Sequence, residues 1–206
     1  RLKDWGDQKI VSNIVFMGQG EPLINMKNLK TAIQILKDKN GLNYGNKKIT
    51  VSTSGIANKI SEAADEIGTY LALSLHAPND ELREKIMPIN KKFKIKELIK
   101  QLKYYTSVVK EPIFLEYVML KGVNDTMECA KELVKLMSQF DSKVNLIEFN
   151  SWPGVKFEPT ERKDIEKFSK YIQDKGYMSF IRRSRGDDVL AACGQLKTES
   201  QKKKKH

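Results

Sequence analysis

The chain has 206 residues, enough to bury one sizeable core, and no stretch approaches the roughly eighteen consecutive apolar residues of a membrane-spanning helix. Its two cysteines exclude a disulfide framework, and it shows no basic-then-apolar leader, so we expect a cytoplasmic protein. The 37 Lys and Arg against 26 Asp and Glu give a net charge of +11, which favours a polyanionic partner such as RNA or DNA.

Apolar periodicity predicts six strands and six helices in alternation. The strands are expected within residues 13–22, 47–55, 69–78, 112–125, 142–150 and 177–188. The helices are expected within residues 28–39, 58–68, 79–87, 95–109, 126–140 and 160–176. Thr126 and Thr160 are the predicted N-caps of the last two helices, and Gly176 is predicted to end the final one.

This alternation predicts parallel strands with right-handed crossovers in one α/β domain, residues 1–196. Residues 197–206, which include the terminal "KKKKH", are expected to form a basic, disordered tail. Two architectures fit the pattern, an open doubly wound sheet and a barrel or partial barrel. In both, ligands bind at the carboxyl ends of the strands.

Small polar or charged residues follow nearly every predicted strand. They are Gly18 to Pro22, Ser52 to Gly55, Ser74 to His76, Glu116 with Lys121 to Asp125, Asn145 with Asn150, and Arg182 to Asp188. Turn chemistry accounts for Gly, Pro, Asn and Asp at such positions but does not require His, Glu and several Arg. The carboxyl edge of the sheet is therefore the predicted functional edge.

The first of these strand ends, "GQGEP", has two interpretations. Glycines at a strand exit let a ligand approach the backbone, and Pro22 stops further strand pairing. In an ordinary βα turn, by contrast, Glu21 would simply cap the next helix. The motif by itself supports both interpretations equally.

The motifs taken in order resemble one protein family. "GQGEPL", "ITVSTSG", "LALSLHAPNDELREKIMPIN", "EYVMLKGVND", "VNLIEFN" and "RRSRGDDVLAACGQL", from about Ser12 to Leu196, resemble the RlmN branch of the RlmN/Cfr radical S-adenosylmethionine RNA methyltransferases. "GEP" and "RSRGDD" distinguish this branch from Cfr. The resemblance implies a partial (β/α)6 radical-SAM barrel without its first strand. It also implies methylation of carbon 2 of an adenine in large-subunit ribosomal RNA and, in many members, in certain transfer RNAs.

The resemblance also implies a binding site for S-adenosylmethionine. The matching residues are Gly20, Glu21, Ser52, Ser74, Leu75, His76 and Asn150. Gly20 and Glu21 match the stretch that binds the amino group of the cofactor's methionine part, and a carboxylate with exposed carbonyls suits an ammonium group. Without the resemblance, a lone histidine such as His76 would be interpreted as structural.

The two cysteines are expected to have different roles. Cys193, in "AACGQL", matches the residue that one S-adenosylmethionine methylates. In the family, a 5′-deoxyadenosyl radical from a second S-adenosylmethionine molecule then takes a hydrogen from that methyl group. The resulting methylene radical adds to the adenine. Cys129 lies in a helical pattern and is expected to be a small core hydrophobe. Arg182, Arg183 and Arg185 are candidates for RNA phosphate contacts, with a solvated basic edge as an equal alternative.

Other family features are missing. Members carry a three-cysteine loop that holds a 4Fe-4S cluster, a second catalytic cysteine and an N-terminal RNA-binding domain. The chain begins near the second barrel strand, so we expect the C-terminal part of a methyltransferase: a truncated product, a partial sequence or an excised segment. Alone it should bind no cluster and be inactive, whereas the full-length enzyme would be a monomer that needs an electron donor.

Two other function classes stay open. A phosphate-handling barrel enzyme would use the same strand ends, but the sequence offers no reactive lysine on a strand and no metal constellation. A non-catalytic RNA-binding module fits the charge but does not explain "AACGQL" or the Gly-Glu-Pro turn. Binding of isotope-labelled S-adenosylmethionine distinguishes these classes from the methyltransferase.

Overall fold

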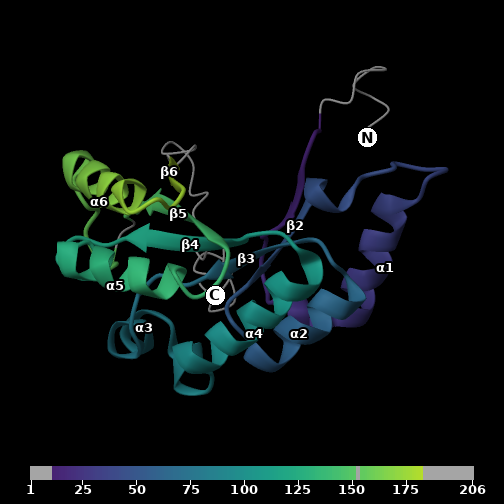
Figure 1. Cartoon of the computed structure of the whole chain (residues 1–206), viewed down its shortest axis with the longest axis horizontal. Helices are drawn as coiled ribbons and strands as arrows, with labels where there is room; N and C mark the ends of the chain where they lie inside the picture. Colours follow the sequence, from purple (N-terminus) through teal and green to yellow (C-terminus); the bar gives the residue numbers. More distant parts are fainter. Residues whose placement is uncertain (1–10, 152–153, 183–206) are drawn as a thin grey trace, which may run out of the picture.

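The computed structural model describes residues 11–151 and 154–182, and within them six parallel strands form one sheet (Figure 1). The strands are β1 (Ile14–Phe16), β2 (Ile49–Thr53), β3 (Tyr70–Ser74), β4 (Ile113–Met119), β5 (Ser142–Glu148) and β6 (Ser179–Arg182). Each lies within a stretch predicted to be a strand. They pair in sequence order without a reversal, which is the order of a barrel, because a doubly wound sheet reverses at a switch point.

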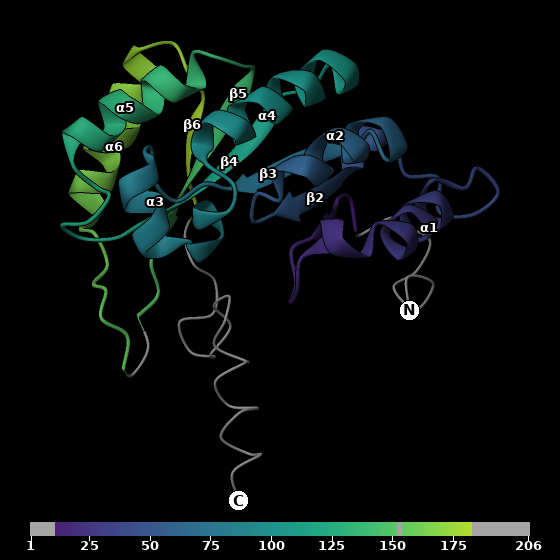
Figure 2. The ribbon, with the colours of Figure 1, turned by 90° about the horizontal axis from the view of Figure 1, so that it is seen from below.

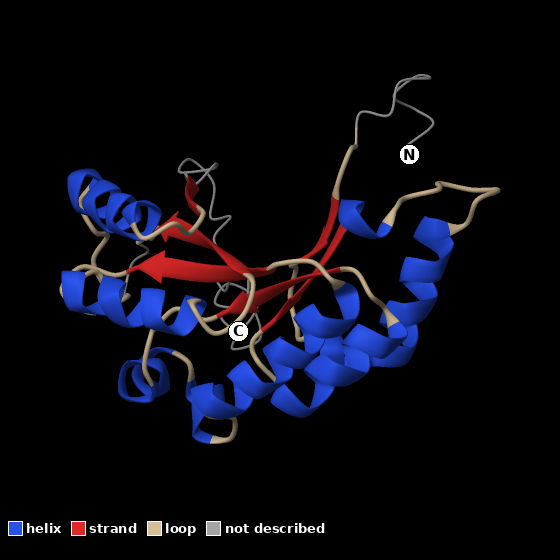
Figure 3. Ribbon diagram, in the orientation of Figure 1, coloured by secondary structure: helices blue, strands red, loops and turns tan. Residues whose placement is uncertain are grey.

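Helices cover the outer, convex side of the curved sheet (Figures 1 and 3). They are α1 (Met26–Lys37), α2 (Ala57–Glu66), α3 (Asp80–Ile86), α4 (Ile95–Val109), α5 (Met127–Met137) and α6 (Arg162–Asp174). All six predicted helices are therefore confirmed. Seen from below, α2 and α4 lie side by side (Figure 2). Buried residues such as Leu71, Leu98 and Leu102 form the core between the helices and the sheet.

Three short 3-10 helices join the elements, and none of them was predicted. They are η2 (Pro22–Asn25), η3 (Asn46–Lys48) and η4 (Pro88–Lys91). Proline opens η2 and η4, where its missing N–H costs no hydrogen bond and its fixed φ angle suits the first turn. The η2 turn brings the chain from the carboxyl end of β1 into α1, so it shapes the carboxyl edge of the sheet.

One of the two predicted helix caps is wrong. Thr126 caps α5, since its side chain accepts a hydrogen bond from the Cys129 N–H at 3.2 Å. The hydroxyl of Thr160 instead donates to Asp125 Oδ2 at 2.9 Å, and α6 begins after Glu161 without a side-chain cap. The bond to the loop after β4 uses the hydroxyl that a cap would need. Gly176 follows α6 with a φ of +88°, as its predicted role requires.

Strand register places two rows of side chains on the inner face of the sheet, because alternate residues of a strand face opposite sides. One row contains Ser52, Ala72, Phe114 and Lys143, and the next contains Ser74, Glu116, Asn145 and Phe180. The β2–β3 half of this face thus carries small side chains, and the β4–β6 half carries large and charged ones. The small side chains leave space at the carboxyl ends of β2 and β3.

None of the helices in the described part of the chain is long and apolar enough to cross a membrane.

The tail of residues 197–206 and the end of the expected domain at 196 lie outside the described residues. The domain boundary therefore stays a prediction.

Candidate cofactor site at the carboxyl edge

A cavity of about 490 Å³ opens at the carboxyl ends of β1, β2 and β3. Its lining comprises Phe16, Met17, Gly18, Gln19, Gly20, Glu21, Pro22, Ser52, Thr53, Ser54 and Ser74. Pockets of this size commonly hold small molecules or cofactors. Four of the predicted cofactor residues, Gly20, Glu21, Ser52 and Ser74, therefore line one cavity, although they come from three different strand ends.

Glu21 occupies the centre of a hydrogen-bonded turn. Its Oε1 accepts from the Leu23 N–H at 3.2 Å, so the carboxylate caps η2. Its Oε2 accepts from both the N–H and the hydroxyl of Ser54, each at 2.7 Å. Glu21 is thus a cap, as one interpretation of "GQGEP" expected, but of the unpredicted η2 turn and not of α1 itself. Capping is compatible with ligand binding, because a carboxylate offers about four acceptor positions and three are used here.

Gly20 has a φ of +89°, in the left-handed region where side chains cause strain. A β-carbon added there would meet no heavy atom within 4 Å. The glycine is therefore required by the backbone turn and not by crowding from the chain itself. Its exposed backbone faces the cavity edge, which leaves the peptide groups of the turn open to a ligand.

His76 follows β3 and is held in one protonation state. Its Nδ1 accepts a hydrogen bond from the Val118 N–H at 3.2 Å, so the ring proton lies on Nε2. Burial, together with the nearby Arg83 charge, lowers the pKa of His76 to about 4. The residue has a φ of 57° and its carbonyl accepts from Asn124 Nδ2 at 2.7 Å. His76 is thus neutral at physiological pH and firmly fixed to the ends of β3 and β4.

A cluster of polar side chains, Glu116, Asn145 and Arg182, lies beside the cavity on the inner face of the sheet. Glu116 pairs in register with Ser74, and its Oε1 accepts from Asn145 Nδ2 at 2.8 Å. Arg182 Nη1 lies 3.8 Å from Glu116 Oε2. Burial raises the pKa of Glu116, while the Asn145 hydrogen bond and the Arg182 charge oppose that rise. These residues give the β4–β6 half of the inner face a defined set of donors and acceptors.

The remaining predicted site residues are placed differently. Leu75 is buried in the core, and its backbone N–H and carbonyl already bond to Glu116 O and Arg83 Nε. Asn150 follows β5 and does not appear in the lining of the cavity as described. Cys193, Arg183 and Arg185 lie outside the described residues. Their roles stay predictions.

Two buried polar residues connect the strand ends around the cavity: Arg83 was not among the predicted strand-end residues, and Asn124 was included only as part of the stretch Lys121 to Asp125. Arg83, with no exposed surface, bonds to the ends of β2 and β3. Asn124, also fully buried, donates to the carbonyls of His76 and Val118 and accepts from the Leu120 N–H. Periodicity gave no signal for Arg83, because a charged residue in a short amphipathic helix is expected at the surface.

The cysteines do not fit an iron–sulfur cluster. The described residues contain no group of three or more His, Cys, Asp or Glu that could hold a metal ion. Cys129 is buried in α5, as expected of a core hydrophobe. With two cysteines in the whole sequence, the chain cannot by itself supply the three thiolates that such a cluster needs.

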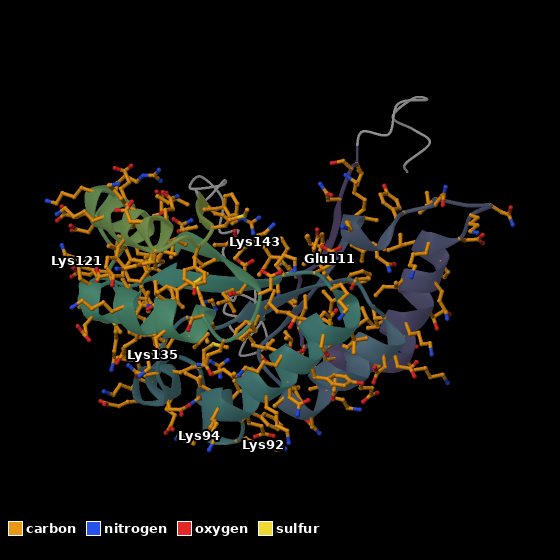
Figure 4. The ribbon with its side chains drawn as sticks, viewed as in Figure 1. Lys92, Lys94, Glu111, Lys121, Lys135 and Lys143 are labelled. Carbon is orange, nitrogen blue, oxygen red and sulfur yellow. The ribbon has the colours of Figure 1, made fainter. Side chains whose placement is uncertain are left out.

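Basic side chains are spread over the molecule. Figure 4 shows Lys92 and Lys94 on the helical side, far from Lys143 on β5. Lys143 Nζ lies 5.9 Å from the centroid of the Phe114 ring on the inner face of the sheet. Phe180 is 48% exposed in β6, two positions before Arg182. Exposed aromatic and basic side chains thus lie together on the β4–β6 half, an arrangement that suits stacked bases and phosphates.

The fold and the cavity define an α/β protein with a partial parallel barrel and a cavity at its carboxyl edge. A model of the radical SAM superfamily matches residues 2–137, and the chain belongs to that superfamily.

Sequence relatives are more specific. A protein of Nitrobacter winogradskyi named dual-specificity RNA methyltransferase RlmN is 46% identical over 98% of this chain and 53% of that protein. A protein of Sinorhizobium fredii with the same name is 50% identical over 95% of this chain and 48% of that protein. The chain therefore spans about half the length of the curated relatives it matches.

Solved structures agree with the fold. The crystal structure of a radical SAM methyltransferase from Sphaerobacter thermophilus matches with a TM-score of 0.87 and 38% identity, over 95% of this chain and 57% of that one. Streptococcus suis SuiB bound to S-adenosylmethionine matches with a TM-score of 0.58 at 18% identity, over 92% of this chain and 41% of that one. The second likeness supports the fold alone.

Proposed function

We propose that the chain forms the cofactor-binding barrel of an RNA methyltransferase of the RlmN type, which methylates carbon 2 of adenine in large-subunit ribosomal RNA and in transfer RNA. The observation that carries the proposal is the carboxylate of Glu21, held at the cavity edge by two hydrogen bonds of 2.7 Å from Ser54. The similarity to proteins named dual-specificity RNA methyltransferase supports the substrate class.

The residues of the cavity fit S-adenosylmethionine, which supplies a methyl group and a radical source when bound. Glu21 keeps an unused acceptor position for the ammonium group of the methionine part, and the Gly20 turn offers backbone groups beside it. Ser52 and Ser74 place hydroxyl groups on the cavity wall. The neutral His76, whose Nε2–H donates to no acceptor among the described residues, is proposed to contact the same ligand, as is Asn150.

RNA would lie along the inner face toward β6, where Phe180 and Arg182 are exposed. Cys193 is proposed to carry the methyl group that is transferred, and Arg183 and Arg185 to contact phosphates. The two cysteines of this chain are too few to hold the cluster. An electron donor, a monomeric state and a cytoplasmic location belong to the same proposal. Membership of the radical SAM superfamily disfavours a phosphate-handling barrel enzyme or a non-catalytic RNA-binding module.

The test joins this chain to the preceding half of its Nitrobacter winogradskyi relative and expresses the chimera in bacteria that lack their own enzyme. Mass spectrometry of ribosomal RNA is expected to find 2-methyladenosine with the chimera and with its Cys129→Ala variant, and none with Cys193→Ala. A chimera that folds and binds S-adenosylmethionine but leaves the RNA unmethylated would contradict the substrate assignment. Full activity of Cys193→Ala would contradict the role of that residue.

A further inference from the structure

Arg83 is a fully buried cation next to the cofactor cavity. It extends from α3 and its guanidinium donates to four acceptors. Nε bonds to Leu75 O at 3.1 Å and Nη1 to Asn90 Oδ1 at 3.0 Å. Nη2 bonds to both Ser54 O at 2.7 Å and Ser74 O at 3.0 Å. One nitrogen therefore joins the carboxyl ends of β2 and β3.

All four acceptors are neutral, and within the part of the chain that the structure describes no carboxylate forms an ion pair with Arg83. The nearby Asp80 is already bonded to Asn90 Nδ2 at 2.8 Å and to the Ile95 N–H at 2.9 Å. Burial lowers the pKa of Arg83 to about 10, so the group remains charged at neutral pH. A buried charge is often no more stabilising than a well-packed apolar residue, so stability alone does not account for it.

Hydrogen bonds connect Arg83, through Ser54, to Glu21, the residue proposed to bind the cofactor. Arg83 fixes the carbonyl of Ser54, and the same residue donates its N–H and its hydroxyl to Glu21 Oε2. The orientation of the Glu21 carboxylate thus depends on where Ser54 is held. Ser74, which lines the cavity from β3, is held by the same guanidinium.

Gly55 shows how closely the backbone and Arg83 approach each other. Gly55 has a φ of +103°, and a β-carbon at this position would lie 3.1 Å from Arg83 Nη2. Any other residue would be strained and would also press on the guanidinium. The turn after β2 is therefore shaped to receive Arg83.

We propose that Arg83 is a positioning residue of the cofactor site, which orients the Glu21 carboxylate through Ser54. This inference rests on the proposed role of the cavity in binding S-adenosylmethionine. Lysine cannot replace arginine here, because a single ammonium group cannot reach four acceptors that a planar guanidinium spans. Loss of Arg83 is expected to affect the recognition of the amino-acid part of the ligand and not of its nucleoside.

The test measures the binding of two probes to the chain by calorimetry. S-adenosylmethionine carries the amino-acid group, whereas 5′-methylthioadenosine lacks it. Arg83→Lys is expected to weaken binding of S-adenosylmethionine about tenfold, the scale of one lost hydrogen bond to a charged group, and to leave 5′-methylthioadenosine within about twofold. The matched control is Tyr105→Phe, which removes a buried 2.7 Å hydrogen bond to Thr69 O just before the opposite end of β3. It should leave both affinities unchanged.

A double-mutant cycle with Glu21→Gln provides the second measurement. If Arg83 acts through Glu21, Arg83→Lys should cost little further affinity once Glu21 is replaced. Additive effects, or equal weakening of both probes, would overturn the positioning role alone. A folded wild-type chain that binds neither probe would overturn the proposed cofactor site, and this inference with it.

Discussion

The state of His76 predicts how stability depends on pH. Its pKa is about 4 in the folded protein, against 6.5 for the ordinary side chain. Between these values the unfolded chain binds a proton that the folded chain does not bind. Stability is therefore fully present above about pH 6.5 and is lost as the pH falls toward 4.

A pKa difference of this size contributes about 3 kcal/mol at most to the free energy of unfolding. The side chain is partly exposed to solvent, which screens part of the effect, so we expect about 1 to 3 kcal/mol. The informative variant is His76→Asn. Asparagine tolerates the φ of 57°, and its Oδ1 can accept the Val118 N–H in place of Nδ1, yet it does not titrate.

Urea unfolding at about pH 7 and about pH 4.5 gives the free energy of unfolding for both proteins. On acidification the wild type should lose about 1 to 3 kcal/mol more than His76→Asn. The carboxylates and His206 are present in both proteins, so their contributions cancel in the difference. Equal losses would refute the argument that His76 is held neutral by the fold.

Further predictions concern the buried polar groups and the cysteines. Because burial raises the pKa of Glu116, the folded protein loses stability as the pH rises through that raised value. The Glu116→Gln variant can still accept the hydrogen bond from Asn145 but carries no charge. Its free energy of unfolding should therefore exceed that of the wild type at pH 7 but not below the ordinary carboxyl pKa. Asn124→Asp removes two donated hydrogen bonds and buries a charge, so unfolding experiments should show a loss of about 3 kcal/mol or more. Cys129→Ala should cost about 1 kcal/mol in the same assay and leave ligand affinity unchanged. After reconstitution with iron and sulfide the chain should hold no stoichiometric four-iron cluster, and iron analysis near four per chain would contradict this.

The order of strands and helices was predictable because each strand is a short β-branched run and each helix carries apolar residues at spacings of three and four. The carboxyl edge followed from the same alternation. Four residues that the family resemblance selected, Gly20, Glu21, Ser52 and Ser74, line one cavity in the structure. Backbone topology and the strand-end motifs thus determine the location of the site.

The hydrogen bonds that support the site could not be predicted, because they join residues far apart in the sequence. Ser54 is 33 positions from Glu21, and Arg83 is 29 from Ser54. A periodic pattern treats Arg83 as a surface charge of an amphipathic helix. Thr160 failed as a cap for the same reason: its hydroxyl bonds to Asp125, 35 positions away. Local propensity is overridden wherever tertiary partners compete for the same polar atom.

The role proposed for Glu21 in the carboxyl-edge cavity is to bind the amino group of S-adenosylmethionine. The most direct measurement is a calorimetric titration of S-adenosylmethionine into the wild-type chain and into Glu21→Gln, whose amide oxygen can still accept from Ser54. We expect the wild type to bind and the variant to bind more weakly, by about tenfold or more, because an ion-paired hydrogen bond loses its charge. Equal affinities of the two proteins would contradict this role.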